Sequence, residues 1–318
     1  MTGTLVIHPG PLGDLLLSVP ALRALRAQRP ADPLLLAAQP RLGALLAALG
    51  VIDRHLSFEK LAIASLFVDD GAPAEVAPLR GASRIVCWFG AGDPVFGRRL
   101  RELWPEAVVA SPTGDQTEPV WQHLLRTVDA PAGDWRAAVT VPAPLVAAGR
   151  AALARAGWDG DASLVIAHPG SGSVSKRWPV EGFARVLGEF RPARRVAVFL
   201  SEGPADHHAV TALTDRLGGA AAGVLRGLEL TELAGALVHA SVYLGNDSGM
   251  SHLAAAVGAP CSILFEEARL AWQPWGSSAQ PLVVTTSPLV PEDVTAVRDR
   301  VLSAVSTAMR CNFGRSWS

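Results

Sequence analysis

The pentapeptide VIHPG at Val6–Gly10 recurs in the second half of the chain as IAHPG at Ile166–Gly170. In each copy an apolar run of β-forming residues ends in a His-Pro-Gly turn, which is typical of a strand that leaves a sheet. The repeat indicates two similar α/β domains rather than one doubly wound sheet.

Short apolar runs alternate with helical periodicity around both copies. This alternation predicts βα units on parallel sheets with covered faces. Strands are expected at Thr4–His8, Leu34–Ala38, Arg84–Trp88, Ser163–His168, Arg195–Leu200, Val242–Gly245 and Cys261–Phe265. Helices are expected at Leu15–Arg29, Arg41–Leu49, Pro179–Phe190, Asp206–Leu217, Thr231–His239, Gly249–Val257 and Pro291–Met309.

The chain of 318 residues is too long for one ordinary domain. We expect one domain over 1–150 and a second domain over 151–290. A C-terminal helix within 291–318 is expected to pack back across the domain junction. Proline and glycine favour a linker with a short Ala-rich helix over 142–161. The composition of 105–135 favours loops.

Composition narrows the class of protein. The net charge is −1 and no long basic run occurs, which argues against a nucleic-acid partner. Cys87, Cys261 and Cys311 are far apart and fit neither a zinc site nor a disulfide framework, so a reducing compartment is expected. The N-terminus lacks the features of a signal peptide, and polar residues interrupt the apolar stretch Leu34–Ile52. We therefore expect a cytoplasmic protein without a transmembrane helix.

The tripeptide Leu12-Gly13-Asp14 directly follows the first expected strand. Carboxyl ends of parallel strands face the ligand crevice, and Gly13 allows the backbone to turn there. Asp14 then stands at a helix start, where its commonest role is that of an N-cap. Pro20 indicates that this helix starts late or kinks. No G-x-G-x-x-G motif is present, so a dinucleotide site of the usual type is unsupported.

A second motif, HPGSGS at His168–Ser173, is followed by Lys176, Arg177 and Trp178. Backbone N–H groups and the hydroxyls of Ser171 and Ser173 can bind phosphate oxygens, and Lys176 can neutralise them. The alternative is a polar surface loop with a solvated cation pair. Trp178 is expected to be a packing residue.

The third motif, GNDSGMSH at Gly245–His252, predicts a strand, a tight polar turn and a helix of small residues. Free N–H groups at a helix start favour an anion. Asp247 or Ser248 is the expected cap of this helix. His252 lies about one turn into the helix, and a structural and a functional role both stay open for it.

Two acids after the strand Arg195–Leu200 are candidates to bind a ribose, as acids do in dinucleotide folds. These are Glu202 and Asp206, and capping of the next helix is the alternative role for Asp206. The adjacent pair His207-His208 lacks a third ligand at metal spacing, so we expect no metal site.

Together the motifs resemble glycosyltransferase family 9, the heptosyltransferases of lipopolysaccharide core assembly. Leu12–Arg26 resembles the family's "GD…PAL" block, His168–Phe183 its "HPG…K-x-W-P…F" block, and Tyr243–Pro260 its "NDSG-x-x-H-L-A-A-A…P" block. Glu202–Asp206 matches a further segment loosely. Ser57–Arg136 matches no acceptor region of the family, and glutamates replace the usual glycine after Phe265.

The resemblance implies a GT-B fold, with two Rossmann-like domains whose parallel sheets face a central cleft. It also implies that the N-terminal domain over 1–150 binds the acceptor and that the domain over 151–290 binds the nucleotide-sugar donor. It implies inverting, metal-independent transfer of heptose from ADP-heptose, with no cofactor. Asp14 and Lys176 are then the catalytic residues, with Asp14 as the general base and Lys176 stabilising the donor diphosphate. Donor-binding residues carried over by motif are Gly13, Ser171, Ser173, Lys176, Glu202 or Asp206, Asp247, Ser248, Gly249, Met250 and His252.

The implied partners are a nucleotide-sugar and a glycan or glycolipid acceptor. A lipid-linked acceptor leaves open a peripheral contact with the cytoplasmic face of the inner membrane. Two alternatives also stay open, namely a GT-B transferase that uses another nucleotide-sugar and a non-catalytic nucleotide-sugar-binding protein.

Overall fold

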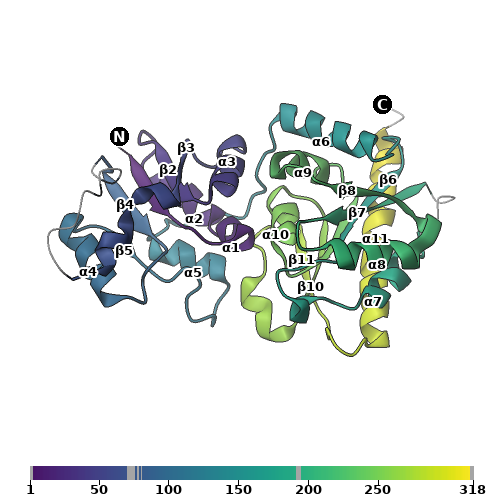
Figure 1. Ribbon diagram of the computed structural model, residues 1–318. Coiled ribbons are helices and arrows are strands. Elements are labelled where there is room, and N and C mark those ends of the chain that lie inside the picture. The colour runs from purple at the N-terminus through teal and green to yellow at the C-terminus, as the bar shows by residue number, and fades with distance from the viewer. Residues whose placement is uncertain (1–2, 70–75, 77–78, 80, 191–194, 316–318) are drawn as a thin grey trace. The chain divides into compact units, whose positions relative to one another are not determined.

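The computed structural model describes residues 3–69, 76, 79, 81–190 and 195–315. The chain forms two compact units, Met1–Arg136 and Ala137–Ser318. Each unit holds one parallel sheet with helices on both faces (Figure 1). The expected boundary at residue 150 falls inside helix α6 (Ala143–Arg155), and α6 belongs to the second unit.

The first unit contains a five-stranded sheet in the order β3-β2-β1-β4-β5. Every neighbouring pair is parallel, and Thr4 of β1 pairs with both Leu34 and Arg84. This is the strand order of the Rossmann fold. Strands are added to one side of β1 as far as β3, and β4 and β5 are then added on its other side. The strands are β1 (Thr4–Ile7), β2 (Leu34–Ala38), β3 (Arg54–Ser57), β4 (Arg84–Cys87) and β5 (Val108–Val109).

Helices cover both faces of this sheet. One face packs against α4 and two 3-10 turns through a core that includes Leu5, Ile7 and Phe96. Side chains alternate along a strand, so Val6 points to the opposite face of the sheet. Val6 is fully buried as well. The helices are α1 (Leu12–Leu17), α2 (Val19–Gln28), α3 (Pro40–Ala48), α4 (Pro94–Leu103) and α5 (Val120–Thr127), and the 3-10 turns are η1 (Phe58–Leu61) and η2 (Ile63–Phe67).

The helix expected over Leu15–Arg29 is divided in two. Pro20 lacks the N–H that a helix interior needs, and it lies in the first turn of α2, where that group has no partner. The hydroxyl of Ser18 donates to the Leu15 carbonyl at 2.6 Å, which satisfies the end of α1. The expected kink therefore is a break between two helices at Ser18.

The second unit contains a six-stranded parallel sheet in the order β11-β10-β9-β6-β7-β8, which is again the Rossmann order. Its strands β6 and β9 lie side by side, with Val165 paired to Val242. The strands are β6 (Ser163–His168), β7 (Val196–Glu202), β8 (Ala221–Arg226), β9 (Val242–Asn246), β10 (Cys261–Phe265) and β11 (Ala279–Val283).

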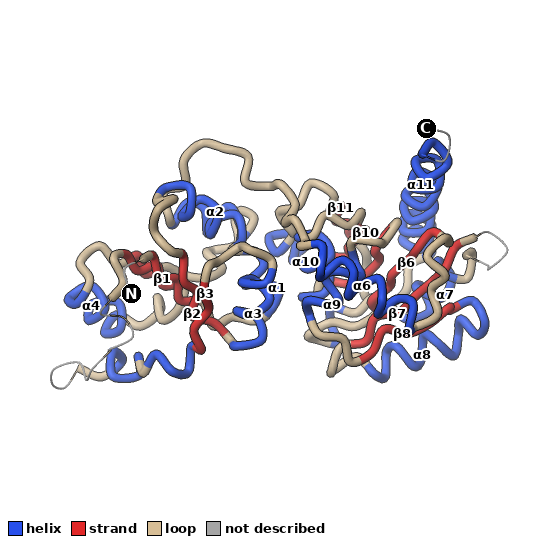
Figure 2. The backbone as a smooth tube through the Cα atoms, turned by 90° about the horizontal axis from the view of Figure 1, so that it is seen from above, coloured by secondary structure: helices blue, strands red, loops and turns tan. Residues whose placement is uncertain are grey.

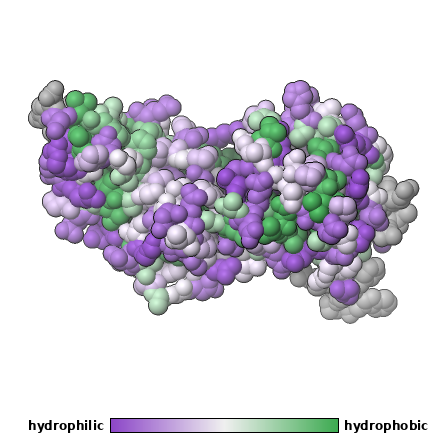
Figure 3. Space-filling model, turned by 90° about the horizontal axis from the view of Figure 1, so that it is seen from below, coloured by the Kyte–Doolittle hydropathy of each residue, from purple (hydrophilic) through white to green (hydrophobic). Residues whose placement is uncertain are grey.

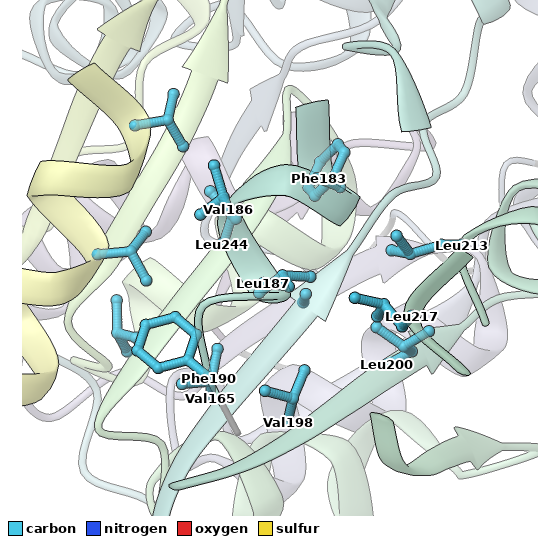
Figure 4. Packing of buried hydrophobic residues seen from close by; sticks show 14 of the residues in the cluster. Val165, Phe183, Val186, Leu187, Phe190, Val198, Leu200, Leu213, Leu217 and Leu244 are labelled. Carbon is cyan, nitrogen blue, oxygen red and sulfur yellow. The ribbon is translucent and has the colours of Figure 1, made fainter. Parts of the chain in front are cut away.

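Helices α7, α8 and α11 lie on one face of this second sheet, and α6, α9 and α10 lie on the other (Figure 2). Figure 4 shows the core between the first of these layers and the sheet, to which Phe183, Leu213 and Leu244 belong. Val297 and Val301 of α11 belong to the same core. The helices are α6, α7 (Val180–Leu187), α8 (His207–Leu217), α9 (Leu230–Leu237), α10 (Gly249–Ala256) and α11 (Pro291–Arg315), with the 3-10 turns η3 (Val174–Lys176), η5 (Gly218–Ala220) and η6 (Glu267–Trp272).

Two glycines let α6 and α9 approach each other closely. A Cβ on Gly149 would lie 2.1 Å from the backbone nitrogen of Ala236, and a Cβ on Gly235 would overlap the Leu145 carbonyl. The segment 142–161 that glycine and proline content marked as a linker is therefore mainly a packed helix.

Several strands and a helix were not predicted from the sequence. Segment 105–135 contains strand β5 and helix α5 besides loops. Strands β3, β8 and β11 were not predicted, and their exposed or half-buried residues explain the weak apolar signal. All three pair with more deeply buried strands, which supply the hydrogen bonds that fix them.

Polar side chains predominate on the face of the molecule drawn in Figure 3. In the described ranges the large exposed apolar side chains are scattered over different elements and are Val68, Leu103, Val174, Val238 and Val283. None of the helices described is both long and apolar enough to cross a bilayer. Cys87 and Cys261 are buried free thiols.

Candidate functional site

The second unit has its topological switch point between β6 and β9. The chain leaves these neighbouring strands toward opposite faces of the sheet, and ligands of open α/β sheets bind in the crevice that opens there. Strand β6 ends at His168 and β9 ends at Asn246. The second and third sequence motifs thus begin at adjacent points of one sheet edge.

Asn246 ties these two motifs together. Its side-chain amide donates to the carbonyls of Pro169 (2.8 Å) and Gly170 (3.3 Å), and its Oδ1 accepts from the backbone N–H of Trp178 (3.0 Å). Asn246 is fully buried. Asn246 belongs to the third sequence motif, but the sequence alone predicted no role for it, because only its spatial neighbours reveal one.

Asp247 lies at the centre of a charged cluster. Its Oδ2 is 3.1 Å from Lys176 Nζ and 2.8 Å from Arg269 Nε, and its Oδ1 is 3.8 Å from His252 Nε2. Burial alone would raise the pKa of Asp247, but its three basic neighbours outweigh burial and hold the pKa below its usual range. The carboxylate is therefore ionised and orients two cationic side chains that are about one-quarter exposed.

Arg269 was missed by the sequence analysis. It lies in η6 and stacks over Trp272 with its guanidinium carbon 4.9 Å from the ring centroid. Because η6 follows β10, Arg269 reaches the same sheet edge as the other motifs. The available signal was its position just after a buried strand, close to the two glutamates that replace the family's glycine.

Helix α10 begins beside this cluster. The Ser248 side chain accepts the backbone N–H of Ser251 and so acts as the N-cap. The hydroxyl of Ser251 donates to the Asn246 carbonyl at 2.5 Å. Gly249 and Met250 occupy the first two helical positions, where backbone N–H groups lack intrahelical acceptors. The helix start and the two cations together favour an anionic ligand.

The loop after β6 is partly internal. Ser171 is buried and donates its hydroxyl to the Ser173 carbonyl, while Arg177 donates to the Ser171 carbonyl at 3.0 Å. Ser173 is exposed, and its hydroxyl lies 2.9 Å from that of Ser175. Ser171 therefore shapes the loop, and Ser173 presents its side chain to solvent. Trp178 is fully buried against Phe183, as expected of a packing residue.

Asp206 is buried under the same loop. Its Oδ2 accepts from the Gly203 N–H at 3.2 Å and lies 3.5 Å from His168 Nε2. Burial lowers the pKa of His168, and the charge of Asp206 opposes that shift. The other ribose candidate, Glu202, pairs with Arg226 at 2.9 Å and with His207 at 3.3 Å. Both carboxylates thus have protein partners.

The first unit contains a pocket of its own at the carboxyl ends of β1, β4 and β5. It has a volume of about 590 Å³ and is lined by residues that include His8, Asp14, Trp88, Phe89 and Ser111. Asp14 lies in the first turn of α1 and Gly13 immediately precedes it, so the first motif lies at the switch point of this sheet. Asp14 and the Lys176–Asp247–Arg269 cluster belong to different units.

The residues described hold no group of three or more His, Cys, Asp or Glu side chains placed to bind a metal ion. Both units carry polar residues at the switch points of their sheets, which is where open α/β sheets bind their ligands. The model of glycosyltransferase family 9 (heptosyltransferase) matches residues 123–294, which is more than half of the chain, and the chain belongs to this family. It is therefore a glycosyltransferase, and the match includes β6 to β11 and their loops.

Solved structures extend this similarity to the whole chain. E. coli ADP-heptose lps heptosyltransferase II has a TM-score of 0.73 at 17% identity, over 98% of this chain and 99% of that one. The glycosyl transferase family 9 protein from Veillonella parvula DSM 2008 has a TM-score of 0.72 at 16% identity, over 96% of both chains. E. coli heptosyltransferase WaaC with ADP has a TM-score of 0.65 at 14% identity, over 96% of this chain and 100% of that one. No curated protein sequence is a detectable relative.

At these identities the similarity concerns the fold. The expected α/β fold of two Rossmann-like domains, the GT-B fold, is confirmed.

Proposed function

We propose that this glycosyltransferase moves heptose from ADP-heptose to a lipopolysaccharide core or related glycan acceptor, with inversion at the anomeric carbon and without a metal ion. The observation that carries the proposal is the cluster of Lys176, Asp247 and Arg269 beside the start of α10. Two cations and one carboxylate leave this cluster with a net charge of +1, which suits a diphosphate. ADP in the similar WaaC structure supports adenine as the donor base.

The cluster also supplies what the leaving group needs. As the bond to the sugar breaks, the diphosphate gains negative charge, and fixed donors in a dry site stabilise such charge well. Lys176 and Arg269 provide charged donors, and the N–H groups of Ser248, Gly249 and Met250 provide neutral ones. In this proposal, these groups take the place of the divalent cation that other glycosyltransferases use.

Asp14 is proposed as the general base. It takes the proton of the acceptor hydroxyl as that oxygen attacks the anomeric carbon on the face opposite the departing ADP. This role requires the carboxylate within ~3 Å of the hydroxyl in the reacting complex. Transfer from a nucleotide-sugar is expected in the cytoplasm, with peripheral contact at the inner membrane where the acceptor is lipid-linked.

The donor proposal is tested by thermal unfolding of the full chain with ADP, UDP or GDP, each with and without EDTA. ADP at 100 times its Kd is expected to stabilise the protein by ~2.7 kcal/mol, and EDTA is expected to leave that shift unchanged. A larger shift with UDP or GDP would identify another donor. Loss of the ADP shift in EDTA would contradict metal independence.

The base is tested by mass-spectrometric detection of product from ADP-heptose and a panel of glycan acceptors. Asp14→Asn is expected to lower the rate of transfer by ~10²–10⁴-fold while the ADP-induced stabilisation stays at the wild-type value. Nearly full activity in Asp14→Asn would refute the assignment of the base. Failure of the wild-type protein with every donor and acceptor would favour a nucleotide-sugar-binding protein without catalysis.

A further inference from the structure

The hydroxyl of Tyr243 is buried beside the proposed donor site and has no part in the chemistry proposed above. Tyr243 lies on β9, and its side chain is fully buried. Its Oη is 3.1 Å from Oγ of Ser251, which lies in the first turn of α10. Burial raises the pKa of Tyr243, so this hydroxyl stays protonated and can donate.

The direction of this hydrogen bond follows from the other partner of Ser251. The Ser251 hydroxyl has a single proton, and it donates that proton to the Asn246 carbonyl at 2.5 Å. Its oxygen can therefore only accept from Tyr243. The Ser248 hydroxyl, at 3.3 Å, is a second donor to the same oxygen. The result is a directed chain from the Tyr243 hydroxyl through the Ser251 hydroxyl to the Asn246 carbonyl.

Gly245 leaves the space in which this chain forms. Tyr243 and Gly245 share one face of β9, because side chains alternate along a strand. A Cβ on Gly245 would lie 2.5 Å from Tyr243 Oη and 2.9 Å from Ser251 Oγ. The hydroxyl of the tyrosine therefore passes over the glycine to reach the helix start, and a larger residue at position 245 would collide with it.

The chain ends on the peptide group that joins Asn246 to Asp247. The carbonyl of this group accepts from Ser251, and its N–H donates to the Leu264 carbonyl at 3.0 Å. A peptide group is planar, so bonds at both of its polar atoms fix its orientation. The side chain that leaves this fixed backbone is the carboxylate of Asp247, whose Oδ2 holds the two cations of the cluster at 2.8 and 3.1 Å.

The partner of Ser251 is unusual for a serine in a helix. Such hydroxyls commonly donate to the carbonyl three or four residues earlier, which would be that of Ser248 or Asp247. Ser251 instead donates to Asn246, five residues earlier and outside the helix. A second donor at its oxygen, supplied by Tyr243, favours the rotamer that makes this bond.

We infer that Tyr243 is a positioning residue of the donor site, which acts through Ser251 to fix the backbone of Asp247. It thereby sets the geometry of the two cations that receive the diphosphate. Because Tyr243 is fully buried, it has this effect without contact with the ligand. The inference rests on the proposed function, since it assigns Tyr243 to the site that the proposal gives to the donor diphosphate.

The first test is calorimetric titration of the full chain and of Tyr243→Phe, which loses the hydroxyl and keeps the ring. The Kd for ADP is expected to rise about fivefold in the variant, as is usual when one hydrogen bond is lost. Inorganic pyrophosphate presents the diphosphate alone and is expected to lose affinity by a similar factor. Unchanged Kd values for both probes in Tyr243→Phe would overturn the inference.

A control on the same strand separates positioning from a general loss of stability. Val242 precedes Tyr243 on β9, and its buried side chain belongs to the core beneath α7, α8 and α11. Val242→Ala is expected to lower stability in urea at least as much as Tyr243→Phe, yet to keep its Kd for ADP within about twofold of wild type. If the Kd follows stability in both variants, Tyr243 has a structural role only and the inference is wrong.

A double variant tests whether the effect passes through Ser251. Ser251→Ala is expected to raise the Kd for ADP about tenfold, because it removes the bond to the Asn246 carbonyl. Tyr243→Phe added to Ser251→Ala is expected to change the Kd by less than about twofold, since the tyrosine hydroxyl then has nothing to position. A further fivefold loss in the double variant would show that Tyr243 acts by another route, against the inference.

The titrations distinguish failure of the inference from failure of the proposed function. Normal binding of ADP by the wild type with no effect of Tyr243→Phe rejects the inference and leaves the proposed donor intact. Binding of pyrophosphate but not of ADP rejects the proposed donor, and the pyrophosphate titration of Tyr243→Phe still decides the role of Tyr243. Binding of neither probe by the wild type rejects both.

Discussion

Gly170 offers a sharp test of how the loop after β6 is held. A Cβ at this position would lie 2.0 Å from Oδ1 and 2.8 Å from Cβ of Asp206, so the whole buried side chain of Asp206 must move in Gly170→Ala. The carboxylate would then lose its contacts with the Gly203 N–H and with His168. Overpacking costs ~1–3 kcal/mol, and an unsatisfied buried polar group adds ~1–3 kcal/mol.

Gly170→Ala is expected to lower the free energy of unfolding by about 3 kcal/mol, which lowers the Tm of a unit of this size by roughly 6–12 °C. The matched control is Gly172→Ala, two residues along the same loop, because its added Cβ meets no atom within 4 Å. That control is expected to be neutral or to stabilise by ~0.4–1 kcal/mol through a less flexible unfolded chain.

The assay is urea unfolding followed by fluorescence, with ADP-induced stabilisation measured in parallel. Gly170→Ala is expected to weaken ADP binding as well, because the displaced loop carries Lys176 next to Asp247. Equal stabilities for the two alanine variants would show that Asp206 does not fill the space beneath Gly170, and the account of this loop would be wrong.

Two further predictions concern charge. Arg269→Gln is expected to weaken ADP binding about tenfold, because a partly exposed charged donor contributes ~1.5 kcal/mol. The control Arg298→Gln, at an exposed position of α11, is expected to bind ADP normally. Calorimetric titration measures both affinities, and wild-type affinity in Arg269→Gln would exclude Arg269 from the site. Burial lowers the pKa of His8 from its usual 6.5 to about 4, so its contribution to stability is complete above pH 6.5 and is lost as the pH falls toward 4. His8→Gln is expected to reduce the drop in unfolding free energy between pH 7 and 4.5 by up to about 3 kcal/mol, with His168 retaining part of the slope. Parallel stability curves for wild type and His8→Gln would contradict this.

The strand-turn repeats could be predicted from sequence because each combines an apolar run with a His-Pro-Gly turn. VIHPG and IAHPG do begin the loops at the carboxyl ends of β1 and β6, and α10 starts at Gly249 as its motif predicts. Lys176 and Asp247 come from separate motifs, and the fold brings them together in one ion pair.

Other features depend on packing that a single sequence does not contain. Gly149 counted toward a linker because glycine is frequent in loops, yet here it permits close helix contact. Arg269 carries no motif, and its role depends on the path of η6 back to the sheet edge. Asn246 looked like one polar residue of a turn, although its hydrogen bonds reach 77 residues back along the chain.

The bonds of Asn246 have a kinetic consequence. Because they hold the loops after β6 and β9 in place, a nucleotide at the proposed donor site need not order these loops and loses little conformational entropy on binding. A site prepared in this way accepts competing nucleotides at similar association rates. Discrimination among them is then expressed in how long each one stays bound.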